Sequence, residues 1–287
     1  MNLHDDLLLK NIPHILRARG FRLYLADNRL GQMRLVDLWQ NGGAVVLGHT
    51  PPNLLREIKN TASRGLYAPY PHFTENRFLK ALSKLLPGRS FRVYAAPPWD
   101  GLRPEELIGA FNRETNEVNG KIAKLWRPFI DAESPFASED TPLLIPVIPG
   151  IQTWRGGLPY GLCVAAVQTE TAASNELLSK LPPSDMLPPV ILAAATRGVY
   201  DLLAAPERAK LSFPRIAKAL KKSRWQRNGI YLNITEEKNK EEWASLFLQF
   251  LKAGFLIPPD QSQPLILPGE MSAGEEAKLA ELLKEDV

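Results

Sequence analysis

A chain of 287 residues is long enough for one large domain or two modest ones with proper hydrophobic cores. Its hydrophobic fraction of 45% and charged fraction of 23% are typical of a soluble globular protein, and a formal net charge of +4 is too small to indicate a nucleic-acid partner. The basic residues between Lys218 and Arg227 accompany no nucleic-acid-binding motif and indicate a solvated helix face.

Residues 1–88 begin with a helix and continue into a predicted β-hairpin, whose strands are Phe21–Leu25 and Met33–Asp37. The pair Thr50-Pro51 is suited to the start of a helix, because it combines an N-cap residue with proline in the first turn. A second helix with one apolar face is closed by Pro87-Gly88.

Residues 89–206 are richer in proline and less regular. Three apolar runs predict strands, at Phe91–Ala96, Leu143–Ile148 and Leu162–Val167. Two helices are predicted, at Pro104–Glu117 and, in a buried setting, at Pro189–Ala204.

Residues 207–287 alternate between helices and strands. The sequence pattern predicts a helix at Pro214–Lys222, a strand at Gly229–Ile234, a helix that ends at Gly254, and a strand at Phe255–Ile257. A final helix opens with Ser272 and Glu275 at the spacing of a capping box.

Cys163 is the only cysteine, which excludes a disulfide framework and any site built from several cysteines. Its apolar flanks predict a buried, inert thiol, although pairing with His49 or His72 as a catalytic dyad stays open.

The histidines are too dispersed for a metal site. The N-terminus is acidic where a signal peptide would be basic, and no apolar run is long enough to span a membrane, so we expect a cytoplasmic protein with no membrane partner.

Eight blocks of the sequence share one pattern of order and spacing: Gly20–Asp27, Leu35–Asp37, Gly42–Pro51, Arg64–Leu66, Gly156–Gly161, Pro188–Ala195, Arg227–Leu232 and Leu251–Pro258. In this pattern the chain resembles the class III pyridoxal-phosphate-dependent aminotransferases, most closely the glutamate-1-semialdehyde aminomutase branch. The resemblance implies an α/β fold of the aspartate-aminotransferase type (fold type I) in which the sheet of the large domain is truncated. It also implies a homodimer.

The resemblance divides the chain into three segments. Residues 1–88 would be the N-terminal part of the small domain and a dimerisation segment, 89–206 a reduced remnant of the large domain, and 207–287 the C-terminal small α/β domain. The three strands of the remnant would be contiguous. The proline-dense stretches 97–104 and 182–189, or the loop at 126–129, would cover the sheet edge that the truncation exposes. The aromatic loop 67–73 would line a pocket or, preferentially, pack in a dimer interface.

The residues that the resemblance assigns to cofactor chemistry are largely replaced. Its imine-forming lysine falls at Gln152, and no lysine occurs from Leu125 to Ser179. The phosphate-binding turn becomes Ala96–Gly101, with two prolines and an aspartate. Ser184 matches a hydroxyl that contacts the phosphate across the dimer, and the substrate-binding arginine falls at Leu265. His49 matches a position that is mostly structural.

These replacements predict a catalytically degenerate protein, a pseudoenzyme that holds neither pyridoxal phosphate nor a metal and acts by binding a small-molecule or protein partner. The alternative is a genuine pyridoxal-phosphate-dependent aminotransferase or aminomutase that uses an unrecognised lysine.

Overall fold

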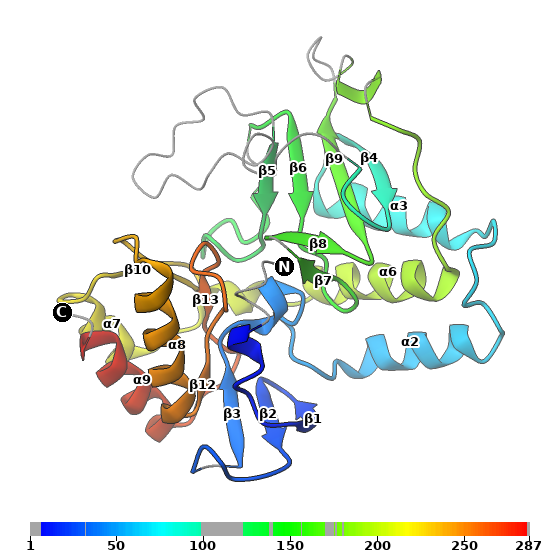
Figure 1. The fold of residues 1–287 in the computed structure, drawn as a ribbon. Coiled ribbons are helices and arrows are strands. Elements are labelled where there is room, and N and C mark those ends of the chain that lie inside the picture. Colours follow the sequence, from blue (N-terminus) through cyan, green and yellow to red (C-terminus); the bar gives the residue numbers. More distant parts are fainter. Residues whose placement is uncertain are drawn as a thin grey trace. The chain divides into compact units, whose positions relative to one another are not determined.

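Two compact units make up the chain (Figure 1). The first contains residues 1–50, 129–135 and 206–287, and the second contains residues 51–128 and 136–205. The computed structural model describes residues 7–31, 33–98, 123–137, 140–155, 157–169, 175, 177–179 and 181–285. The predicted helix Pro104–Glu117 lies outside these residues. None of the helices within these ranges is long and apolar enough to cross a membrane.

The first sheet of the first unit has the strand order β1 (Ile15–Arg19), β2 (Arg22–Leu25), β3 (Arg34–Asp37) and β12 (Phe255–Leu256). The predicted hairpin is confirmed, since β2 and β3 pair antiparallel with Leu23 opposite Leu35. Strand β12 comes from the other end of the chain and pairs parallel to β3. The sequence did not predict β1, because its side chains are nearly all exposed and leave no alternating apolar pattern.

A second sheet in the same unit has the order β10 (Trp225–Asn228), β11 (Tyr231–Ile234) and β13 (Leu265–Ile266). The predicted helices of this region are α7 (Pro214–Leu220), α8 (Lys240–Ala253) and α9 (Ala273–Glu285). Helix α8 begins at a capping box formed by Asn239 and Glu242 and ends at Gly254, which has a φ of 97°. Short 3-10 helices occur at Gln40–Gly43 (η1) and Pro206–Lys210 (η2).

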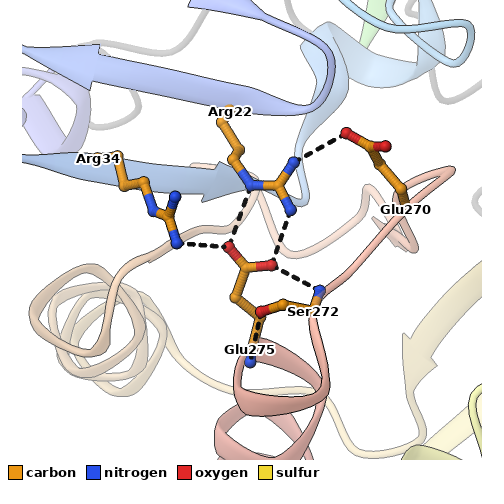
Figure 2. Close-up of polar contacts among 5 residues, drawn as sticks. All are labelled: Arg22, Arg34, Glu270, Ser272 and Glu275. Atoms are coloured by element: carbon orange, nitrogen blue, oxygen red, sulfur yellow. Dashed lines mark hydrogen bonds and ion pairs between the residues drawn. The ribbon is translucent and has the colours of Figure 1, made fainter.

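A network of ion pairs joins helix α9 to the N-terminal strands (Figure 2). Arg22 on β2 donates from Nε and Nη2 to the two carboxylate oxygens of Glu275, at 3.1 and 2.8 Å, and from Nη1 to Glu270 at 3.0 Å. Arg34 on β3 lies 3.5 Å from Glu275, and Ser272 and Glu275 form the predicted capping box. Burial raises the pKa of Glu275, but the hydrogen bonds from Arg22 and Ser272 outweigh it and lower that pKa to about 2.

The sheet of the second unit has the order β4 (Arg89–Tyr94), β9 (Cys163–Gln168), β6 (Leu143–Pro146) and β5 (Ala123–Trp126) across the described residues. The predicted contiguity of three strands is confirmed, because β9 pairs antiparallel with both β4 and β6. Strand β5, which the sequence did not predict, pairs parallel to β6. A hairpin of β7 (Thr153–Arg155) and β8 (Leu158–Tyr160) contributes Trp154 and Leu158 to the buried cluster on one face of this sheet.

Helices α2 (Pro52–Ala62), α3 (Thr74–Leu85) and α6 (Pro189–Leu203) complete the second unit, and all three were predicted. Both α2 and α3 pack on α6. Helix α6 is buried over most of its length because it is rich in small and apolar side chains, including Leu192, Ala194, Ala195, Val199 and Leu202.

Candidate functional site

Gln152 lies in the loop between β6 and β7, the position that the resemblance assigns to the imine-forming lysine. Only 1% of this residue is exposed. Its Oε1 accepts a hydrogen bond from the amide of Ile148 at 2.7 Å, and its Nε2 donates to the carbonyls of Pro146 and Leu162 at 3.2 and 2.9 Å. The side chain thus ties the end of β6 to the residue directly before β9.

The loop that carries Gln152 is packed tightly against two helices. A Cβ on Gly150 would lie 2.4 Å from Leu54 of α2, and a Cβ on Gly198 of α6 would lie 2.2 Å from the carbonyl oxygen of Pro149. Side-chain carbons do not approach backbone atoms so closely, so position 198 requires glycine, and the φ of 119° at Gly150 favours glycine at that position too. The loop backbone is therefore held on two sides by close contacts.

An amide at position 152 has no amine with which to form an imine, and it does not take up a proton near neutral pH. The flanking lysines in the sequence are Lys124, which lies on β5, and Lys180, which lies outside the described residues. Gln152 therefore does not fit a cofactor held as a Schiff base at this position. Its three hydrogen bonds give it a structural task instead.

Ser184, which the resemblance assigns to the cofactor phosphate, lies along the outer edge of β4. Its Oγ accepts a hydrogen bond from the amide of Val93 at 3.1 Å. The next residue, Asp185, donates its amide to the Val93 carbonyl at 2.8 Å and accepts from the amide of Ala95 at 2.9 Å. This part of the proline-dense stretch 182–189 therefore covers a sheet edge that would otherwise present free backbone groups.

The turn after β4 is the other expected cofactor contact. Pro97 and Pro98 supply no amide donor, because proline lacks a backbone N–H. Asp100 lies outside the described residues. The described part of this turn therefore lacks two of the backbone N–H groups that could bind a phosphate.

His49 pairs with Asp37, a residue that the sequence analysis did not single out. The His49 Nε2 lies 2.9 Å from Oδ2 of Asp37, which is 2% exposed, and Oδ1 of Asp37 accepts from the amides of Trp39 and Gln40. Gln40 and Asn41 have positive φ values of 47° and 48°, which are costly for residues other than glycine. The His49–Asp37 pair therefore stabilises a strained turn in the first unit. One feature of the sequence could have identified Asp37: it ends a predicted strand directly before this glycine-containing turn.

The remaining candidates do not form a reactive centre. Burial raises the pKa of the Cys163 thiol to about 12, so this residue does not supply a thiolate near neutral pH to a dyad with His49 or His72. Leu265 is fully buried on β13 and supplies no charge for a substrate carboxylate. Among the residues that the structure describes, no group of three or more His, Cys, Asp or Glu residues is arranged to hold a metal ion.

No protein-family model matches the chain. Two curated proteins resemble it over nearly its whole length. A protein from Treponema pallidum is 24% identical, covering 93% of this chain and 93% of its own, and one from Borreliella burgdorferi is 27% identical, covering 95% of this chain and 91% of its own. Both are described only as uncharacterized proteins, so they assign no activity.

Solved structures are similar to the chain in fold. An acetylornithine aminotransferase from Elizabethkingia anophelis has a TM-score of 0.60 at 12% identity, covering 95% of this chain and 93% of that one. A glutamate-1-semialdehyde-aminomutase from Pseudomonas aeruginosa has a TM-score of 0.62 at 14% identity, covering 95% of this chain and 86% of that one. Likeness at such low identity concerns the fold and not the chemistry. The chain has the fold type I architecture of pyridoxal-phosphate-dependent aminotransferases and aminomutases, as its sequence predicted.

Proposed function

We propose that this protein is a catalytically degenerate member of the aminotransferase fold. In this proposal it forms no Schiff base with pyridoxal phosphate and acts by binding a small-molecule or protein partner. The observation that carries the proposal is the state of Gln152, which is 1% exposed and bonded through both ends of its amide.

The hydrogen bonds of Gln152 explain why a lysine does not suit this loop. A lysine ammonium donates hydrogen bonds but accepts none, so the buried amide of Ile148 would lose its acceptor. A glutamine satisfies that amide and the two facing carbonyls together. Glutamine at position 152 therefore suits the hydrogen bonds that link the end of β6 to the start of β9. A lysine that formed an imine with the cofactor would lose these hydrogen bonds.

The proposal also covers cofactors, assembly and location. We expect no bound pyridoxal phosphate and no metal, a homodimer on the strength of the resemblance, no membrane or nucleic-acid partner, and a cytoplasmic setting. Light scattering coupled to size-exclusion chromatography tests the dimer directly, because it gives the mass of the assembly in solution.

A titration of the purified protein with pyridoxal phosphate tests the loss of the cofactor. An internal imine absorbs in the near-visible range, and a ligand present at about 100 times its Kd stabilises a folded protein by about 2.7 kcal/mol, which a thermal shift detects. We expect neither signal, with an active aminotransferase stripped of cofactor as the positive control. Saturable absorbance together with stabilisation would support the alternative, an enzyme that uses a different lysine.

A further inference from the structure

Helix α3, drawn in cyan in Figure 1, carries a stripe of positive side chains that are exposed to solvent. Arg77, Lys80 and Lys84 recur at spacings of three and four residues, which places them on one face of the helix, and all three are exposed. Phe73 lies one turn before Arg77 and is 50% exposed. We call these four residues the α3 stripe. The opposite face of α3 is buried and consists of Phe78, Ala81, Leu82 and Leu85.

No described residue neutralises the positive charge of Arg77, Lys80 and Lys84 in the α3 stripe through an ion pair. Residues 51–88 contain six lysines and arginines but only two acidic residues, Glu57 and Glu75, so this stretch accounts for the whole net charge of +4. Exposed helix faces usually mix the two signs, with acidic residues one turn from basic ones.

Aromatic rings hold two of these cations in place without neutralising them. The Arg77 guanidinium lies 4.3 Å from the centre of the Phe73 ring, and the Lys84 Nζ lies 5.3 Å from the centre of the Tyr200 ring. Such contacts restrict a flexible side chain while its charge stays available. A restrained cation loses less conformational entropy when it binds an anion.

We propose that the α3 stripe docks an acidic segment of a partner protein. This inference rests on the proposed function, in which the chain acts through a binding partner. The three cations span eight residues, a rise of about 10 Å along the helix axis, so they match carboxylates on two successive turns of a partner helix. Arginine and aromatic residues are also enriched in protein interfaces, and Arg77 and Phe73 supply both.

Other occupants fit the α3 stripe less well. A single-stranded nucleic acid would stack bases on exposed rings, but the Phe73 ring is already in contact with Arg77 and with the His72 ring, whose centre lies 4.0 Å away. A membrane surface would require exposed apolar residues between the cations, but between Arg77 and Lys84 the exposed residue besides Lys80 is Ser83, and the exposed Phe73 precedes all three cations. A symmetric contact with a second copy would bring like charges together.

Fluorescence anisotropy of a labelled peptide tests the proposal on the full-length protein. The probe is a helical peptide with glutamates at spacings of three and four residues, titrated at low and at physiological salt. The test variant is Arg77→Glu/Lys80→Glu/Lys84→Glu. The matched control is Lys218→Glu/Lys221→Glu/Lys222→Glu, which changes the net charge equally at three exposed lysines at the end of helix α7 and in the turn after it. Circular dichroism verifies that both variants are folded.

We expect the change in the α3 stripe to weaken peptide binding by about tenfold or more and the control change to alter it by less than about twofold. Equal losses in both variants, or no binding by the wild type, would overturn the proposal. Tighter, stripe-dependent binding of poly(U) RNA or of phosphatidylserine vesicles would also overturn it, in favour of those partners. This outcome is read separately from the pyridoxal phosphate titration, so a failure of the α3-stripe proposal is distinguishable from a failure of the proposed function.

Discussion

A lysine introduced at position 152 should weaken the fold rather than restore an aminotransferase site. Gln152→Lys can still donate to the carbonyls of Pro146 and Leu162, but it removes the acceptor of the Ile148 amide. It also introduces an ammonium group where the wild-type residue is 1% exposed.

The expected loss follows from these two effects. A buried amide left without a partner costs about 1–3 kcal/mol. Burial of the ammonium adds to this, whether the charge is retained or the pKa of the lysine falls until it is neutral. We therefore expect the free energy of unfolding to fall by about 3–5 kcal/mol, which is a large part of the roughly 5–15 kcal/mol available to a typical domain.

Urea unfolding followed by circular dichroism measures this loss. Gln152→Met serves as the control, because it has a similar volume, removes the acceptor of the Ile148 amide as lysine does, and adds no charge; it should cost about 2–3 kcal/mol. Methionine also gives up the two donations that lysine can keep, so a larger loss in Gln152→Lys than in Gln152→Met reports the cost of the charge. A Gln152→Lys variant that is as stable as the wild type, or that binds pyridoxal phosphate as an imine, would refute the reasoning.

Further predictions concern acid stability, packing and thiol reactivity. The pKa of Glu275 is lowered from 4.5 to about 2, so its contribution is complete above pH 4.5 and is lost as the pH falls toward 2; it amounts to at most about 3 kcal/mol. Urea midpoints measured between pH 2 and 6 should therefore vary less in Glu275→Gln than in the wild type, whereas the same change at Glu270, whose side chain is 71% exposed, should leave the profile unaltered. Gly198→Ala should cost about 2–4 kcal/mol because of its close contact, while Gly274→Ala, with open space around the new Cβ, should be neutral or slightly stabilising in thermal melts. Cys163 should react with a thiol reagent only after denaturation; rapid reaction of the native protein would contradict its burial.

Elements with strong local signals were predictable from the sequence. Alternating apolar residues predict the hairpin of β2 and β3, and helical periodicity with a terminal glycine predicts helix α8. Each of these signals lies within a short stretch of sequence. Strands β5, β7, β8 and β10 were missed because each contains only three or four residues and none has the uninterrupted apolar run that marked β6 and β9. In such short strands, pairing with another segment decides the structure more than local preference does.

At the candidate site, the sequence identified the position but not its environment. Gln152 was found by its place before a glycine-rich motif, whereas its partners Ile148 and Leu162 become neighbours only when the strand ends meet. Asp37 was missed for a similar reason, because its contact with His49 closes a turn whose shape depends on residues with positive φ. The expected division at residues 88 and 206 and the role of Ser184 at a phosphate stay predictions.

The central claim is that no lysine of this protein forms an imine with pyridoxal phosphate. Borohydride reduction of an equimolar mixture of protein and cofactor, followed by intact-mass measurement and peptide mapping, tests it most directly, because reduction fixes any imine permanently to its lysine. We predict a mass unchanged from that of the untreated protein, for the wild type and Gln152→Met alike. Stoichiometric labelling that maps to one lysine would contradict the account and identify the residue that performs the chemistry.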